Sequence, residues 1–287
     1  MNSELPLHPL EKILQERIAY IDGAMGTMIQ QYKLQEADFR GERFKDWKGK
    51  DLKGNNELLL LTKPEVILEI HQKYFAAGCD IVETNTFSAT SIGQHDFFFK
   101  NHEEGKKKDQ AFFEEVIHDP LLIELTRDLN LAAAKIARQA ADEYAQKTGQ
   151  VKFVAGAIGP MPVTASISPD VNDPSFRSVN FQQLRKSYTE QLEALIEGGI
   201  DLILVETIFD TLNAKAALYA TQDVLEKTGK KLPIMISGTI TDKSGRTLTG
   251  QTSEAFWNSV AHVKPLTIGL NCALGPDLMR AYVEELS

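Results

Sequence analysis

The feature that most limits the fold of this chain is a short apolar run that recurs six times, with helical segments between the runs. Each run is nearly continuous in apolar and β-branched residues, which is typical of a strand buried on both faces of a parallel sheet. The runs cover residues 17–26, 79–87, 152–160, 201–210, 232–240 and 266–275. Strands that alternate with helices at this spacing predict βαβ crossovers and one parallel sheet.

Three helices can be placed between the runs. Residues 62–65 (TKPE) have the form of a capping box with an early proline, and they predict a helix through Phe75 that stops at Gly78. Residues 180–183 predict the start of a second helix, which keeps a 3.6-residue period to Ile196 and stops at Gly198-Gly199. Residues 129–146 predict a third.

Polar residues follow every apolar run, and two units resemble each other, residues 77–84 (AGCDIVET) and 199–207 (GIDLILVET). Repeated βα units with polar strand ends favour a (β/α)₈ TIM-type barrel, in which loops at the carboxyl ends of the strands build the active site. A doubly wound sheet is the alternative. It would need a glycine-rich phosphate loop after an early strand, and residues 22–26 (DGAMG) do not have that pattern.

Only six strands can be placed in the 287 residues, whereas this barrel has eight. We therefore predict a single barrel domain over residues 1–287 that is truncated after about six βα units, with strands 7 and 8 absent. Residues 96–120 read as a surface insertion whose Phe97-Phe98-Phe99 run covers apolar surface or touches a neighbouring domain. Unpaired edges on the first and sixth strands would favour self-association.

Charge and composition narrow the possible partners. A net charge of −9 and a pI near 5.3 argue against nucleic acid, because phosphate binding needs a basic surface. Two cysteines provide no disulfide framework, and no apolar run is long enough to cross a bilayer. Residues 1–17 lack the apolar centre of a signal peptide. We expect a cytoplasmic protein that binds neither nucleic acid nor membrane.

Candidate functional side chains stand at the ends of the apolar runs. Cys272 ends the sixth run and is either a ligand or nucleophile, or a small buried apolar group. Carboxylates at Asp22, Glu83 and Glu206 suit an ammonium group or proton transfer, or could cap helices. We expect Asp210 to cap the next helix and Cys79 to pack in the core. The polar side chains of Asn85, Ser237 and Asn271 could bind a small substrate or cap the helices that follow.

Six segments together resemble the homocysteine-binding domain of cobalamin-dependent methionine synthase. They are residues 22–27 (DGAMGT), 83–87 (ETNTF), 164–173 (TASISPDVND), 205–215 (VETIFDTLNAK), 237–241 (SGTIT) and 269–275 (GLNCALG). The resemblance runs from about Arg17 to the end of the sequence. It implies a (β/α)₈ barrel that binds zinc through three cysteines and the thiol of homocysteine. Zinc lowers the pKa of that thiol, and the thiolate takes a methyl group from methylcobalamin on another domain, which methyltetrahydrofolate recharges.

Residue by residue, the resemblance makes Cys272 the first zinc ligand. It makes Asp22 and Glu206 partners of the homocysteine amino group, and it places Asn85, Ser237 and Asn271 near them. Members of the family also carry an adjacent Cys-Cys pair after the eighth strand, and this sequence has none. We therefore expect the zinc site to be incomplete, so that the isolated chain binds zinc poorly and is inactive.

Other functions remain open. A cobalamin-independent homocysteine methyltransferase that uses betaine or S-methylmethionine would share the barrel and the chemistry. Residues 164–173 and 205–215 point to the cobalamin-dependent type. The chain could also be an inactive fragment or a split subunit that needs a partner chain, with cobalamin- and folate-binding domains supplied elsewhere. A barrel aldolase is a remote alternative, because no run ends on a lysine that could form a Schiff base.

Overall fold

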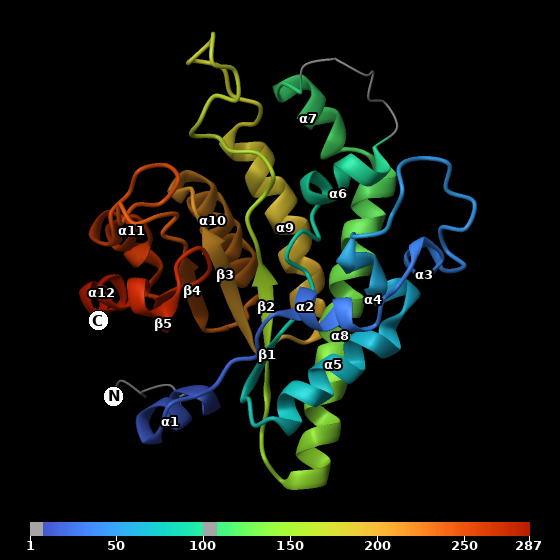
Figure 1. Ribbon diagram of the computed structural model, residues 1–287, viewed down its shortest axis with the longest axis vertical. Helices are drawn as coiled ribbons and strands as arrows, with labels where there is room; N and C mark the ends of the chain where they lie inside the picture. The colour runs from blue at the N-terminus through green and yellow to red at the C-terminus, as the bar shows by residue number, and fades with distance from the viewer. Residues whose placement is uncertain (1–7, 100–107) are drawn as a thin grey trace.

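The computed structural model describes residues 8–99 and 108–287, and it shows an α/β fold built on one parallel sheet (Figure 1). The sheet has five strands in the order of the sequence, β1-β2-β3-β4-β5, and every neighbouring pair is parallel. The strands are β1 (Ile81–Glu83), β2 (Phe153–Ile158), β3 (Leu202–Ile208), β4 (Ile234–Gly238) and β5 (Thr267–Leu270). This confirms the predicted βα alternation for five of the six apolar runs.

The first apolar run differs from the prediction, because it forms a single parallel bridge between Ile21 and Ile81 instead of a strand. Backbone hydrogen bonds from Asp80 and Ile81 to the Tyr20 carbonyl, and from Asp22 to the Ile81 carbonyl, hold this segment beside β1. Among the described residues no ladder joins β5 to this segment. Closure into a barrel is therefore not seen in this part of the chain.

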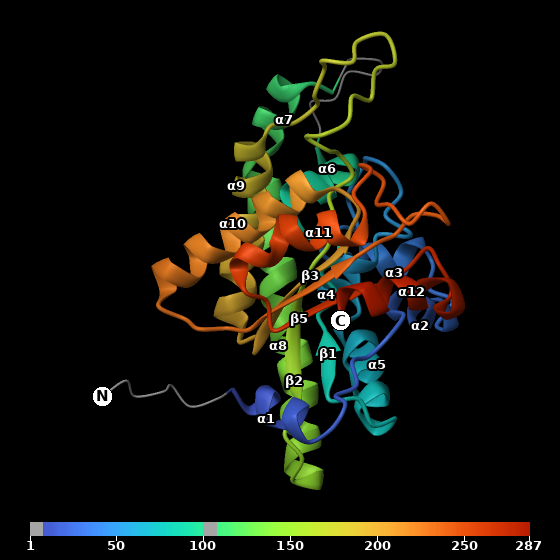
Figure 2. The same cartoon turned by 90° about the vertical axis from the view of Figure 1, so that its left-hand side faces the viewer.

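Helices connect the strands, and the four long ones cover one face of the sheet (Figures 1 and 2). The long ones are α5 (Pro64–Ala76), α8 (Pro120–Thr148), α9 (Phe181–Gly198) and α10 (Thr211–Thr228). The shorter ones are α1 (Pro9–Glu16), α2 (Met25–Gln31), α3 (Glu36–Arg40), α4 (Leu59–Thr62), α6 (Ser91–Phe98), α7 (Gln110–Val116), α11 (Ser253–Val260) and α12 (Pro276–Leu286). No helix in these described ranges is both long enough and apolar enough to cross a membrane.

The helix ends agree with the predicted caps in two places and differ from the prediction in a third. Asn180 and Gln183 form the predicted capping box of α9, and Asp210 caps α10 through the backbone N–H groups of Leu212 and Asn213. The capping box predicted at residues 62–65 is wrong. Thr62 ends α4, its hydroxyl donates to the Leu58 carbonyl, and α5 begins at Pro64 without a side-chain cap. The predicted helix over 129–146 is the second half of the longer α8.

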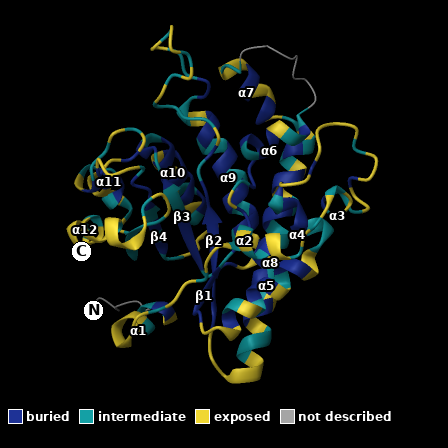
Figure 3. Cartoon of the chain, in the orientation of Figure 1, coloured by how far each residue is buried: buried dark blue, intermediate teal, exposed yellow. Residues whose placement is uncertain are grey.

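The core lies between the sheet and the four long helices, and in Figure 3 the central strand β2 and the inward faces of these helices are buried. Five alanines along α8 are buried, at positions 133, 134, 137, 140 and 141. They let α9 approach so closely that a Cβ atom on Gly198 would lie 2.5 Å from the Ala134 Cβ. This close packing fixes the helical layer, and through it the positions of the strand ends.

The opposite face of the sheet is covered differently at its two ends. At the amino ends of the strands, Leu10 of α1 packs against a small apolar cluster that includes Ile81, Phe153 and Leu202. Because side chains alternate along a strand, Glu83 and Glu206 lie on this same face, two and four residues further along β1 and β3. The carboxyl half of this face therefore carries the carboxyl groups of Glu83 and Glu206.

Two aspartates tie neighbouring segments together at the amino ends. Asp80 precedes β1 and accepts hydrogen bonds from the Arg17 guanidinium at 2.7 and 2.8 Å and from the Tyr20 backbone N–H. Asp201, at the same place before β3, accepts from Arg138 at 2.7 Å and from the Val154 backbone N–H. The bond from Arg17 is the main reason why the pKa of Asp80 falls to about 2. The similarity between the two sequence units thus extends to their contacts.

The segment predicted as an insertion, residues 96–120, includes the end of α6 and all of α7, and its residues 100–107 lie outside the described part. Phe98 is buried against the rings of Phe44 and Trp47, and Phe99 packs edge-on against Phe112 of α7. The phenylalanine run therefore covers apolar surface within this chain. That the segment is an insertion in a larger domain stays a prediction.

Candidate active site

A cavity of about 800 Å³ lies at the carboxyl ends of the strands, on the face of the sheet opposite the four long helices. It is lined by residues from the segment after the Ile21 bridge, from β1 and its loop, and from β3, β4 and β5. All six residues predicted for the site line it, namely Asp22, Asn85, Glu206, Ser237, Asn271 and Cys272. The structure thus brings the whole predicted set together, as a parallel sheet does with its strand ends.

Three carboxyl groups form an acidic cluster in this cavity, on Asp22, Glu83 and Glu206. Burial, together with the nearby charge of Glu206, raises the pKa of Asp22 to about 8, although the Glu83 backbone N–H donates to both Asp22 oxygens at 3.1 Å. Burial, followed by the charges of Glu206 and Asp22, raises the pKa of Glu83 to about 9. Burial also raises the pKa of Glu206.

No lysine, arginine or histidine is among the described residues that line the cavity. The carboxyl groups therefore repel one another without a cationic partner from the chain. A ligand that brings a positive charge would relieve this repulsion and favour the ionised carboxylates. An ammonium group, with three N–H donors, suits such a cluster.

A fourth carboxyl group in the cavity, that of Glu57, was not predicted from the sequence. It belongs to the 3₁₀ turn Asn56–Leu58, and its Oε1 accepts the Ser88 backbone N–H at 2.8 Å. Burial raises the pKa of Glu57. The same turn binds Asn85, whose side-chain amide donates to the Asn56 carbonyl. Since Glu57 follows no apolar run, no strand-end signal could have indicated it.

At the other side of the cavity a hydrogen-bonded network joins β3, β4 and β5. The Asn271 Oδ1 accepts from the Thr207 backbone N–H at 3.2 Å and from the Ser237 hydroxyl at 2.7 Å. Its Nδ2 donates to the Thr207 Oγ1 at 2.8 Å and to the Cys272 Sγ at 3.1 Å. The Thr207 hydroxyl donates in turn to Glu206 Oε2 at 3.1 Å. An unbroken chain of contacts therefore links the Glu206 carboxyl to the Cys272 sulfur.

The two cysteines have different surroundings. Cys272 is exposed at the cavity, whereas Cys79 is buried, and burial raises the pKa of the Cys79 thiol to about 12. The prediction that Cys79 packs in the core is confirmed. Among the described residues that line the cavity, Cys272 is the one cysteine.

Zinc needs three or four protein ligands. In the described ranges no group of three or more histidine, cysteine, aspartate or glutamate residues is arranged to hold a metal ion. Cys272, whose sulfur accepts a hydrogen bond from the Asn271 amide, provides one ligand. The pKa values of the nearby Asp22 and Glu83 carboxyl groups are raised, so these groups favour the protonated form over the ionised form that binds a metal. The described residues therefore do not form a complete zinc site.

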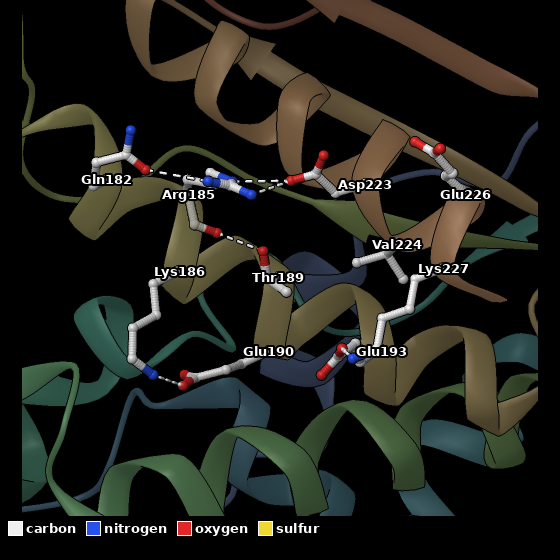
Figure 4. A pocket seen from close by; sticks show the side chains of 10 residues that line it. All are labelled: Gln182, Arg185, Lys186, Thr189, Glu190, Glu193, Asp223, Val224, Glu226 and Lys227. Carbon is white, nitrogen blue, oxygen red and sulfur yellow. Dashed lines mark hydrogen bonds and ion pairs between the residues drawn. The ribbon is translucent and has the colours of Figure 1, made fainter.

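A second cavity, of about 670 Å³, lies on the outer surface between α9 and α10 (Figure 4). Its charged side chains are mostly paired with one another, Arg185 with Asp223, Lys186 with Glu190, and Lys227 with Glu193. The pairs bridge the two helices or successive turns of α9, so they account for most of the charge there. This groove offers no set of free groups that would bind a substrate.

Comparison with known proteins places the chain in a family. In solved structures, the chain is similar to the homocysteine methyltransferase MmuM from Escherichia coli in its metallated form, with 20% identity and a TM-score of 0.67 over 97% of this chain and 82% of that one. The apo form of MmuM gives 18% identity and a TM-score of 0.63 over 97% and 81% of the two chains. At this identity the likeness establishes the fold alone. The family model for homocysteine S-methyltransferases matches residues 19–287, and the chain therefore belongs to the homocysteine S-methyltransferase family.

Proposed function

We propose that this chain is the homocysteine-binding module of a methionine synthase of the cobalamin-dependent type. The observation that carries the proposal is a cavity that holds the acidic cluster at one side and the exposed thiol of Cys272 at the other, without a cation from the chain. L-Homocysteine carries an ammonium group and a thiol on one short chain. Its ammonium group would bind Asp22 and Glu206, and its thiol would lie beside Cys272.

This chain's own contribution to the reaction is to bind and orient the amino acid. Asp22 and Glu206 are the ammonium partners, with Glu83 beside them, and Asn85, Ser237 and Asn271 surround the bound chain. A thiol fixed in one place meets the methyl donor in a limited set of directions, which lowers the entropic part of the barrier. The donor must enter through the carboxyl-end face, since the amino-end face is packed by α1.

Zinc, which the resemblance implies, would lower the pKa of the substrate thiol when bound. Cys272 would be one of its ligands. Since the described residues do not complete the site, we expect the purified chain to bind little zinc and to transfer no methyl group alone. Elemental analysis checks this, and one zinc ion per chain would contradict it.

The direct methyl donor and the partners are part of the proposal. The segments 164–173 and 205–215 support methylcobalamin, presented by another domain, over betaine or S-methylmethionine. In that case cobalamin- and folate-binding domains belong to the same parent protein or to a partner chain, and the protein acts in the cytoplasm. The unpaired edges at β5 and at residues 20–22 support self-association. Sequencing the surrounding gene for these domains, and light scattering of the chain, test both points.

Ligand binding is tested by isothermal titration calorimetry at pH 7.5. We expect L-homocysteine to bind, and Asp22→Asn or Glu206→Gln to weaken it at least tenfold, because each removes a charged partner of the ammonium group, and tenfold is about 1.4 kcal/mol. Glu226→Gln, an exposed change on α10, serves as the matched control and should bind as the unchanged chain does.

The ligand also has a matched control. 4-Mercaptobutyrate keeps the thiol and the carboxylate of homocysteine but lacks the ammonium group, so we expect no measurable binding. Equal affinity for the two compounds, or no effect of either carboxyl substitution, would overturn the proposed function.

A further inference from the structure

Thr207 has a backbone conformation that β-branched residues rarely adopt. Its φ is +56°, in the left-handed region, at the point where the register between β3 and β4 shifts. Such a conformation costs on the order of 1–3 kcal/mol and persists only where the surrounding contacts enforce it. Cys272 and Ala273, which follow Asn271 after the end of β5, also have positive φ, of +60° and +56°. Strained backbone therefore flanks the cavity on two strands.

The conformation of Thr207 aims two of its groups at the cavity network. The backbone N–H points to Asn271 Oδ1, and the hydroxyl stands between Glu206 Oε2, to which it donates, and Asn271 Nδ2, from which it accepts. A regular strand at this position would turn the N–H toward β4 or β2 instead. The strain is thus coupled to the link between β3 and β5.

The amide of Asn271 has no hydrogen-bonding capacity left for a substrate. Its oxygen accepts from Thr207 and Ser237, and its two N–H groups donate to Thr207 and to the Cys272 Sγ. Two acceptor sites and two donors are all that an asparagine side chain offers. The Asn271 backbone is held as well, because its N–H donates to the Gly238 carbonyl and its carbonyl accepts from the Thr239 hydroxyl.

We infer that Thr207 and Asn271 are positioning residues that fix the separation between the Glu206 carboxyl and the Cys272 sulfur, and so select an amino thiol of one chain length. The inference rests on the proposed function, in which Glu206 binds the ammonium group and the thiol lies beside Cys272. The inference requires that homocysteine reaches both groups and that cysteine, which is one methylene shorter, reaches only one of them. Asn271 lines the cavity, but the hydrogen-bonding groups of both side chains are already used within the network, so neither residue gives the ligand a hydrogen bond.

The test compares L-homocysteine with L-cysteine by calorimetry in Thr207→Val and Thr207→Ser. Valine keeps the β-branch but removes the hydroxyl that joins Glu206 to Asn271, and serine keeps the hydroxyl. We expect the valine variant to bind homocysteine about tenfold more weakly, in line with the loss of a hydrogen bond to a charged group, and to change its cysteine affinity less than about threefold. Serine should restore the ratio of the unchanged chain.

A second readout does not depend on ligand. In the ¹⁵N-labelled chain the side-chain amide of Asn271 should exchange slowly with solvent, and Thr207→Val should speed this exchange while Thr207→Ser does not. Should the valine variant fail to fold, Thr207→Ala removes the same hydroxyl with less crowding at positive φ.

The outcomes separate the inference from the function on which it rests. An unchanged homocysteine-to-cysteine ratio in the valine variant, or an equal loss for both ligands, would overturn the inference and leave the proposed function standing. Binding of neither amino thiol by the unchanged chain would overturn both.

Discussion

Replacing Glu83 with glutamine should stabilise the protein at neutral pH, because the folded chain keeps this carboxyl from ionising. The pKa of Glu83 rises to about 9 through burial and the charges of Glu206 and Asp22, from an ordinary value of 4.5. An acid whose pKa is raised by folding stabilises the fold fully below its unfolded pKa. This stabilisation is lost as the pH rises toward the folded pKa.

The size follows from the same two values. Each pH unit between the unfolded pKa and the pH of the experiment is worth about 1.4 kcal/mol, which gives about 3 kcal/mol at pH 7. Because Glu83 keeps partial contact with water in the cavity, screening lowers this to about 2 kcal/mol. At pH 5 the same reasoning gives well under about 1 kcal/mol.

The assay is urea unfolding followed by circular dichroism at pH 5 and pH 7, with Glu226→Gln as the exposed control. We expect Glu83→Gln to raise the free energy of unfolding by about 2 kcal/mol at pH 7, equivalent to roughly 5 °C in Tm. The control should change neither value. A glutamine variant that is less stable than the unchanged chain at pH 7, or equally shifted at both pH values, would refute the argument that folding keeps the Glu83 carboxyl from ionising.

Two further predictions concern groups outside the cavity. In urea titrations at pH 7, Asp80→Asn should lower the free energy of unfolding by about 1–2 kcal/mol, because the ion pair with Arg17 is lost. This loss should shrink as the pH falls toward 2, since the pKa of Asp80 is about 2. An equal loss at pH 3 and pH 7 would contradict the prediction. His71 of α5 is fully buried, neither ring nitrogen has a partner within the described residues, and burial lowers its pKa to about 4. The unchanged protein should therefore lose up to about 3 kcal/mol between pH 6.5 and pH 4, and His71→Leu should flatten that part of the Tm-against-pH curve; parallel curves would count against a neutral, unpartnered histidine.

Much of the site could be predicted from the sequence because parallel strands bring their carboxyl ends to one edge. Asp22, Glu206 and Cys272 each end an apolar run, so their positions along the chain were enough to predict that they share a cavity. Glu57 could not be found in this way, since it reaches the cavity from a 3₁₀ turn that precedes α4. The role of Thr207 was also hidden, because a positive φ is a property of the backbone path and threonine gives no hint of it.

The fold was predictable to the same depth. Continuous apolar runs indicated buried parallel strands, and five of them form the sheet. The run at residues 17–26 reads like the others, yet its pairing is limited to Ile21, with Ile18 74% exposed. Whether an apolar run becomes a full strand depends on the strands that pair with it on either side, and the sequence of the run alone does not carry that information.

The two ends of the sheet lose stability at opposite extremes of pH. At the amino ends, Asp80 is held as an anion by Arg17, so acid weakens the attachment of residues 17–21 to β1. At the carboxyl ends, Asp22 and Glu83 are held toward their neutral forms, so alkali weakens the cavity wall. The sensitivity of the sheet to pH therefore changes along the strand direction: its amino end is sensitive to acid and its carboxyl end is sensitive to alkali. A titration followed residue by residue would show the molecule loosening first from one end in acid and first from the other in base.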